Sequence, residues 1–98
     1  MERDEIVARL RAREVELRRG GILHLALFGS RARGDGAAES DVDLMEDYDR
    51  TRRLTLFDKA GLEVEIAETL DAAVDLCDRE FLEGPVRVWA EREAVVVF

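Results

Sequence analysis

Two short segments joined by a glycine-rich stretch constrain this chain more than any other feature. Residues 22–28 are mostly apolar and rich in residues that favour strands, and Gly29 follows them. This pattern predicts a largely buried strand that ends in a turn. In residues 41–44, aspartate alternates with an apolar residue, which is the period of a strand with one apolar face and one carboxylate face. The stretch between them, 29–40, is rich in Gly, Ala and Ser and is expected to be a loop with room for one helical turn.

The segments before and after these two predicted strands have apolar residues at helical spacing. Residues 2–19 place apolar side chains at helical spacing among Arg and Glu, which predicts one amphipathic helix that is stopped by Gly20 and Gly21. Thr51 is expected to cap a second long helix that runs to about residue 70. The apolar face of this second helix is expected to carry Leu54, Phe57, Gly61 and Val64.

The rest of the chain adds one strand, one helix and an apolar end. Residues 73–77 predict a third strand, and Pro85 suits the first turn of a short helix. Trp89 is expected to anchor this helix in the core or at a partner interface. Residues 94–98 are apolar and can pair as a strand. The order of elements predicts the α/β (α+β) class, with one domain over residues 1–98 and a small mixed β-sheet flanked by helices.

Length and composition restrict the class of protein. A chain of 98 residues supports one domain and leaves no room for a second core. No stretch approaches the roughly 18 consecutive apolar residues that a membrane span needs, and residues 1–20 lack the apolar stretch of a signal peptide. A cytoplasmic protein without a membrane partner is therefore expected. Cys77 is the only cysteine, which excludes an intramolecular disulfide and a cysteine-based zinc site.

The charge of the chain is strongly negative and uneven. The net charge of −8 argues against direct nucleic-acid binding, because phosphate backbones are bound by basic surfaces. Residues 61–98 contain ten acidic residues and three arginines, so most of the negative charge lies there. Basic residues gather in the middle of the sequence, at Arg31, Arg33, Arg50, Arg52, Arg53 and Lys59. A local basic patch on an acidic protein suits a small anion such as a triphosphate better than a long polyanion.

The turn after the first predicted strand has residues that can grip phosphate. Gly29 lets the backbone approach a phosphate and point its amides at the oxygens. The hydroxyl of Ser30 and the guanidinium groups of Arg31 and Arg33 can add further donors, since arginine can bind phosphate through two parallel hydrogen bonds.

The aspartates of the second predicted strand have the chemistry of a metal site. Asp41 and Asp43 are two residues apart, so a strand places both carboxylates on one face. Two adjacent carboxylates repel each other unless a cation lies between them, and Mg²⁺ takes carboxylate oxygens together with substrate phosphates. Each pattern alone is more often an ordinary turn or a solvated loop, but the two together favour a nucleotide site. The neighbouring residues Glu39, Glu46, Asp47 and Asp49 are interpreted as solvated charge, and Tyr48 as a partly exposed aromatic near a turn.

The same residues resemble a known signature. Gly-Ser at positions 29 and 30, then ten residues, then Asp41-x-Asp43 is similar to the signature of the DNA polymerase β nucleotidyltransferase superfamily. The form Gly-Ser-x-Ala-Arg-Gly-Asp with Ser-Asp-x-Asp-Leu resembles its minimal branch, the MNT proteins. That family has a third carboxylate on a later strand, and Asp75 stands within Val-Asp-Leu, 32 residues beyond Asp43. The ending over 91–95 is also like the family's, so the resemblance covers essentially the whole chain.

The resemblance implies a polymerase β palm-like nucleotidyltransferase fold and a site that binds ATP. Gly29 and Ser30 would hold the β- and γ-phosphates, and Arg33 would contact the triphosphate. After Asp-x-Asp-Leu, the strand of the family usually continues with apolar residues, whereas this chain continues with Met-Glu-Asp-Tyr-Asp over 45–49. The second strand is therefore expected to end early or to emerge into solvent there.

The catalytic residues implied by the resemblance are three aspartates. Asp41 and Asp43 would bind two Mg²⁺ ions, and Asp75 would complete the second metal site and draw the proton from the attacking hydroxyl. The implied reaction is an in-line attack on the α-phosphorus, which leaves a nucleoside monophosphate on the acceptor.

The resemblance also implies a partner. MNT proteins are commonly paired with a helical HEPN protein in toxin–antitoxin modules, where the MNT protein adds AMP to a tyrosine of the HEPN ribonuclease and silences it. An antitoxin that acts by AMPylation is therefore expected. Two alternatives stay open: a non-catalytic antitoxin that neutralises its partner by contact through the acidic segment 61–98, and a transferase for a small molecule such as an aminoglycoside. The absence of a second substrate domain counts against the last, and the sequence leaves the choice between a homo- and a hetero-oligomer open.

Overall fold

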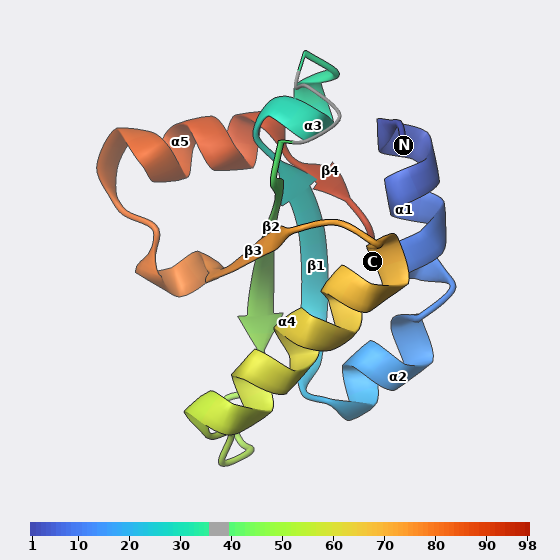
Figure 1. The fold of residues 1–98 in the computed structure, drawn as a ribbon. Helices are drawn as coiled ribbons and strands as arrows, with labels where there is room; N and C mark the ends of the chain where they lie inside the picture. Colours follow the sequence, from blue (N-terminus) through green and yellow to red (C-terminus); the bar gives the residue numbers. More distant parts are fainter. Residues whose placement is uncertain (36–39) are drawn as a thin grey trace.

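The chain folds around a four-stranded mixed sheet (Figure 1). The computed structural model describes residues 1–35 and 40–98. The strand order is β3-β2-β1-β4, with β1 at Ile22–Phe28, β2 at Val42–Tyr48, β3 at Val74–Asp78 and β4 at Val95–Val96. β1 is antiparallel to β2 and to β4, whereas β2 and β3 are parallel. The predicted mixed sheet flanked by helices is confirmed, and β1 and β3 lie within a residue of their predicted positions.

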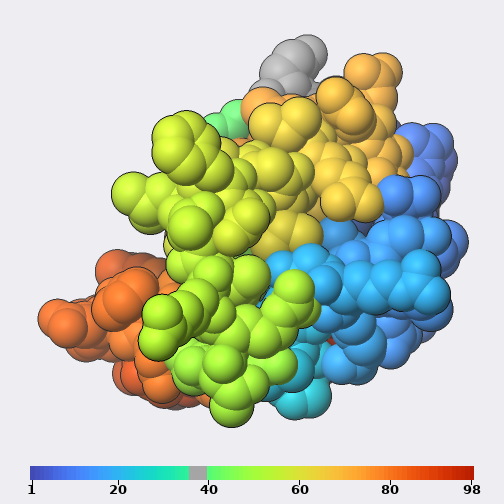
Figure 2. Space-filling view, turned by 90° about the horizontal axis from the view of Figure 1, so that it is seen from below, coloured from blue at the N-terminus to red at the C-terminus, as the bar shows by residue number. Residues whose placement is uncertain are grey.

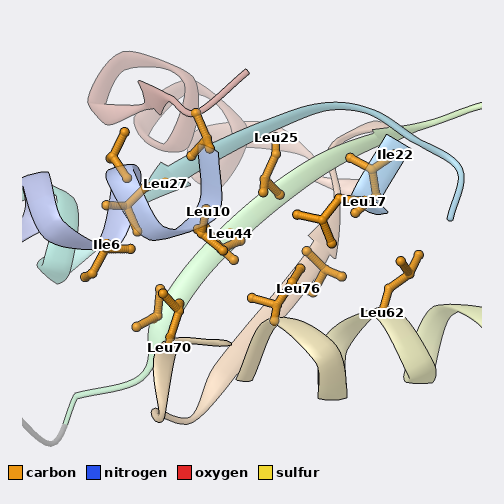
Figure 3. Close-up of a cluster of buried hydrophobic side chains, with 14 of the residues drawn as sticks. Ile6, Leu10, Leu17, Ile22, Leu25, Leu27, Leu44, Leu62, Leu70 and Leu76 are labelled. Atoms are coloured by element: carbon orange, nitrogen blue, oxygen red, sulfur yellow. The ribbon is translucent and has the colours of Figure 1, made fainter. Parts of the chain in front are cut away.

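Three helices cover one face of the sheet and enclose the core (Figure 3). These are α1 (Arg3–Arg11), α2 (Glu14–Arg19) and α4 (Leu56–Leu70), which connects β2 to β3. The buried side chains that meet between the helices and the sheet include Ile6, Leu10, Leu17, Ile22, Leu25, Leu27, Leu44, Leu62, Ile66, Leu70 and Leu76. Because each such side chain contributes roughly 1.5–3 kcal/mol when it leaves water, this single apolar layer is the main source of stability.

The prediction of one helix over 2–19 is wrong, because the segment forms two helices. α1 ends at Arg11 and α2 begins at Glu14, with a turn at Ala12 and Arg13. Neither Gly nor Pro stands at this break, so the sequence carries no local signal for it. α1 packs against α4 and α2 packs against β1, and the turn lets both helices bury their apolar side chains.

The second long helix, α4, begins later than predicted. Its N-cap is Thr55 rather than Thr51. The amide of Asp58 donates to the hydroxyl of Thr55 at 3.1 Å, and the amide of Thr55 donates to the carboxylate of Asp58 at 2.8 Å. This reciprocal pair satisfies two amides at the start of the helix and fixes its first turn. Thr51 instead donates its hydroxyl to Asp49 in the preceding turn, at 2.6 Å.

Two apolar stripes run along α4, and the core takes the one that was not predicted. Leu62, Ile66 and Leu70, spaced by four residues, are buried against the sheet. Phe57 and Val64 of the predicted face are 89% and 55% exposed. Periodicity showed that the helix has an apolar face, but it could not choose between two such faces.

β2 continues to Tyr48 instead of ending early. Its last residues pair with the start of β1, so that Tyr48 lies opposite Ile22. The side chains of Glu46 and Tyr48 therefore point to the core face, where the residues are 1% and 9% exposed. The interpretations of Glu46 as solvated charge and of Tyr48 as partly exposed are wrong, because strand pairing assigns alternate residues to the core face whatever their type.

The segment after β3 crosses to the other face of the sheet. After β3 come the short helix η1 (Arg79–Phe81) and α5 (Gly84–Glu93), which has Pro85 in its first turn as predicted. A groove of about 340 Å³ lies between α5 and the sheet, lined in part by Ala26, Met45 and Glu91. Trp89 is 61% exposed, so it does not anchor α5 in the core. Within the described ranges, no helix is long and apolar enough to cross a membrane.

Candidate active site

Two of the three predicted catalytic aspartates lie side by side on the face of the sheet opposite to the core. Asp43 of β2 and Asp75 of β3 are direct neighbours in the parallel register. Leu44 and Leu76, the next residue of each strand, are buried in the core, so strand alternation turns the two aspartates to the other face. Asp41 immediately precedes β2 and is exposed. The crossover through α4 thus brings together carboxylates that are far apart in the sequence.

Negative charge is concentrated at Asp43. Partial burial raises the pKa of Asp43, and the carboxylates of Asp75 and Asp41 raise this pKa further. The guanidinium group of Arg33 opposes them and lowers the pKa. Asp43 is therefore close enough to Asp75 and to Asp41 to be repelled by each, and a cation bound beside it would relieve that repulsion.

Gly29 joins β1 to the short helix α3 (Ser30–Arg33), which is the single helical turn expected in this loop. Its backbone has φ 76° and ψ −161°, a conformation that residues with a side chain rarely adopt. A Cβ atom at this position would collide with the carboxylate of Asp43. The position therefore requires glycine for two reasons, and it places the start of α3 beside the carboxylate of Asp43.

Arg33 lies next to the carboxylates and is held by two acidic side chains. Its Nη1 donates to both carboxylate oxygens of Glu93 at 3.0 Å, and its Nε donates to Asp35 at 3.0 Å. The Arg33 side chain is 45% exposed, so part of the guanidinium group is open to a ligand. Sequence reasoning did not assign a role to Glu93, although the family-like ending that contains it was the available signal.

Arg31 has a structural role. It is buried, and its Nη1 and Nη2 donate to the backbone carbonyls of Ser40 and Met1, both at 2.8 Å. These bonds tie α3 to the segment before β2 and to the start of the chain. Of the two arginines that could donate to phosphate, Arg33 is the accessible one.

The basic patch expected from the sequence is divided between the two ends of β2. Arg50 donates to Asp78 at 2.7 Å, and Lys59 lies 3.8 Å from the carboxylate of Glu46. Both lie toward the end of β2 that is remote from Gly29, and seven residues of strand span roughly 20 Å. Only the arginines of α3 are near the carboxylates. The predicted solvated residue Glu39 lies outside the described residues.

A separate cavity of about 430 Å³ lies between α3 and the start of α1. It is lined by Arg31, Arg33, Gly34 and residues 1–4, and none of the three aspartates lines it. The cavity therefore adjoins the candidate site without containing its carboxylates.

The donor set fits a divalent cation that arrives together with its nucleotide. Among residues 1–35 and 40–98, no group of three or more His, Cys, Asp or Glu side chains is gathered closely enough to hold a metal ion alone. Asp41, Asp43 and Asp75 nevertheless offer hard oxygen ligands in mutual repulsion. Mg²⁺ is typically held by one or two carboxylates plus substrate phosphates and water, so an incomplete protein ligand set is the arrangement that it uses.

Cys77 lies on the same face as Asp75, two residues along β3. Its thiol donates a weak hydrogen bond to the carboxylate of Asp75 at 3.9 Å. Partial burial, together with Asp75 and Asp43, raises the pKa of the Cys77 thiol to about 11. The thiol is therefore protonated near neutral pH and is unsuited to act as a nucleophile.

Comparison with known families and curated proteins agrees with this geometry. The family model described as "Polymerase beta, Nucleotidyltransferase" matches residues 14–98. The protein adenylyltransferase MntA of Thermococcus cleftensis is 34% identical over 99 residues, which cover 96% of this chain and 94% of that protein.

Two solved structures share the fold. One, described as a minimal nucleotidyltransferase, has a TM-score of 0.80 at 32% identity and covers 97% of this chain and 95% of its own. The other is a complex of an MNT antitoxin with the tri-AMPylated HEPN toxin of Shewanella oneidensis. It has a TM-score of 0.62 at 19% identity over 90% of this chain and 68% of that chain. At that identity the second likeness shows a common fold alone.

Proposed function

The chain belongs to the polymerase β nucleotidyltransferase family, and we propose that it is a protein adenylyltransferase that transfers AMP from ATP to a hydroxyl group. The observation that carries the proposal is the juxtaposition of Asp43 and Asp75 beside the Gly29 turn. An adenylyltransferase that is 34% identical over nearly the whole chain supports the choice of nucleotide. Residues 1–98 would form one minimal nucleotidyltransferase domain.

Each polar residue of the site has a role in this reaction. Gly29 and Ser30 bind the β- and γ-phosphates through the start of α3, and Arg33 pairs with the triphosphate through the part of its guanidinium group that faces solvent. Asp41, Asp43 and Asp75 hold Mg²⁺, which when bound neutralises charge on the pyrophosphate and favours the deprotonated acceptor.

The chemical step exchanges one bond to phosphorus for another. The acceptor oxygen forms a bond to the α-phosphorus as the bond from that phosphorus to the pyrophosphate oxygen breaks. The proton of the acceptor hydroxyl passes to the carboxylate of Asp75, which is exposed on the sheet face and returns it to water. The products are the adenylylated acceptor and pyrophosphate.

We place the acceptor hydroxyl on a tyrosine of a HEPN-type toxin, so that the chain acts as an antitoxin by AMPylation in the cytoplasm. The support is the family signature in this sequence, together with an MNT antitoxin of the same fold that is found in complex with a tri-AMPylated HEPN toxin. Asp75 and Asp41 are exposed, so an acceptor can reach the carboxylates from solvent.

The decisive experiment incubates the protein with Mg²⁺, the product of the neighbouring gene, and ATP labelled on the α-phosphate. Label is expected on the neighbouring protein with α-labelled ATP and not with γ-labelled ATP, and Asp43→Asn is expected to abolish it. If no label is transferred while a stable complex still silences the neighbouring protein, the function is binding alone. Equal labelling by Asp43→Asn and the unaltered protein would refute the catalytic role of the aspartates.

A further inference from the structure

One face of α4 is apolar, and no part of the described chain covers it. Phe57 and Val64 are seven residues apart, about two helical turns, and therefore lie on the same side of the helix. They are 89% and 55% exposed. Ala60 and Gly61 lie between them and are also exposed. Figure 2 shows α4, coloured from yellow-green to yellow, at the outer surface of the molecule with no other element over it.

Gly61 makes this face flat at its centre. A Cβ atom at Gly61 would meet no atom of the described residues within 4 Å, so the packing of this chain does not require glycine there. A glycine in a helix interior costs roughly 1 kcal/mol relative to alanine. The distance between packed helices depends on the side chains at their contact, so Ala60 and Gly61 allow a second helix to approach closely. A groove of about 510 Å³, lined in part by Phe57 and Gly61, follows one flank of the face.

The two ends of this face carry opposite charges. Glu68 stands four residues after Val64 on α4, and Arg53, in the segment that leads into this helix, lines the groove beside Phe57. Both are exposed, and neither makes an ion pair with any of the described residues. Glu65, by contrast, is already paired with Arg13 at 2.7 Å. The face is thus apolar in the middle, positive at one end and negative at the other.

We propose that this face, formed by Phe57, Ala60, Gly61, Val64 and Glu68 of α4 and by Arg53 of the segment before the helix, binds the same face of a second copy of the chain. In an antiparallel arrangement with the two-fold axis between Ala60 and Gly61, Phe57 of each copy lies against Val64 of the other. The same axis brings the end of the face beside Arg53 in each copy to the Glu68 end of the other. A two-fold axis makes every contact twice, so the face is complementary to itself in shape and in charge. A partner of one charge sign would match only one end.

Pairing through α4 leaves the candidate active site accessible. α4 packs on the core face of the sheet through Leu62, Ile66 and Leu70, whereas Asp43 and Asp75 lie on the opposite face. Both copies of the dimer therefore keep an open carboxylate face. The dimer and the proposed function are independent, so either can fail without the other.

The first test measures molar mass by sedimentation equilibrium over a concentration series of the full chain. We expect a concentration-dependent dimer whose dissociation constant rises at least tenfold in Val64→Asp. Val15→Asp is the matched control, because Val15 is a 60% exposed valine on α2 and the change adds the same charge. Since both sites are exposed, circular dichroism should show both variants folded.

The second test exchanges the charges at the ends of the face. Arg53→Glu and Glu68→Arg are each expected to weaken the dimer, because each places like charges opposite one another. The double variant is expected to restore it, since the ion pair is rebuilt in reverse. Arg92→Glu is a control for the change in net charge, because Arg92 is exposed on α5.

Three outcomes would overturn the proposal. These are a monomer at every concentration, a Val64→Asp variant that dimerises like Val15→Asp, and a double charge variant that stays as weak as the single ones. If the chain is monomeric and Val64→Asp weakens its complex with the product of the neighbouring gene, the face belongs to that protein and not to a second copy.

Discussion

Glu46 is a carboxylate on the core face of β2, between Leu44 and Tyr48. Burial raises its pKa to about 7. The hydroxyl of Tyr48 and, to a smaller degree, Lys59 at 3.8 Å offset part of this effect, while Asp78 adds to it. Neither oxygen of Glu46 completes a hydrogen bond of good geometry with any described residue. A buried carboxylate without full compensation costs free energy whenever it is ionised.

We therefore predict that the stability of the protein falls between about pH 4.5 and pH 7 because of Glu46. In that window the folded state keeps the proton of Glu46, whereas the unfolded state releases it. The stability that this proton binding provides at low pH is therefore lost as the pH rises through the folded-state pKa. The loss is on the order of 3 kcal/mol when complete. Glu46→Gln should remove most of this slope and be the more stable protein at pH 8, as measured by urea denaturation at pH 5 and pH 8. The exposed Glu2→Gln is the control, and a slope unchanged in Glu46→Gln would contradict the assignment.

Glu93 is a positioning residue for Arg33 if Arg33 binds the triphosphate. Its two contacts at 3.0 Å fix Nη1 of Arg33 while Asp35 holds Nε, which leaves Nη2 to face a ligand. Glu93→Gln should raise the KM for ATP by about threefold to tenfold and leave kcat nearly unchanged, because it disorders a binding group without touching the reacting atoms. Glu93→Asp should recover part of the loss. The control is Glu91→Gln on the same helix, whose partners are Arg79 and Arg87; equal KM values in the two variants would exclude this role.

At the scale of elements, the sequence could predict the features that depend on residues close together in the chain, such as the alternation of apolar and polar residues along a strand. The alternation around Asp43 fixed the face of β2, and the Gly29 turn was recognisable from one residue type. Sequence alone could not find that Glu93 reaches Arg33, because that contact joins residues sixty apart through the placement of α5. The prediction of Thr51 rather than Thr55 as the start of α4 was wrong, because it did not weigh what distinguishes these two good caps. Only Thr55 has an acidic residue three positions later with the geometry of a capping box.

This difference between the two threonines predicts that their alanine variants lose different amounts of stability. Thr55→Ala removes the acceptor for the amide of Asp58 and should lower the free energy of unfolding by about 1 kcal/mol. Thr51→Ala removes only a hydroxyl that donates to Asp49 in an exposed turn, so its cost should be clearly smaller. Urea denaturation of the two variants in parallel measures both. A larger loss in Thr51→Ala would mean that the helix starts before Leu56 in solution.

At the scale of the whole molecule, the candidate site is assembled from four separate parts of the chain. The turn after β1, the start of β2, the start of β3 and the end of α5 meet on one face of the sheet. The apolar layer on the other face holds these parts in place, so the sheet keeps Asp43 beside two carboxylates that repel it, those of Asp75 and Asp41. Repulsion between these carboxylates lowers the free energy of unfolding. A cation bound there should raise it again.

Mg²⁺ is therefore expected to stabilise the folded chain, and Mg²⁺ with ATP to stabilise it more. A ligand that binds only the folded state adds about 1.4 kcal/mol when its concentration is ten times its dissociation constant, which for a domain of this size shifts Tm by several degrees. Asp43→Asn should be more stable than the unaltered protein without metal, because it removes one of the repelling charges, and should respond less to Mg²⁺. Asp71→Asn is the matched control: it makes the same change at the exposed left-handed end of α4, a backbone position that asparagine tolerates. Thermal melts with EDTA, with Mg²⁺ and with Mg²⁺ plus a non-hydrolysable ATP analogue separate these effects. If Mg²⁺ raises the Tm of Asp43→Asn as much as that of Asp71→Asn, the cation binds elsewhere on this acidic chain.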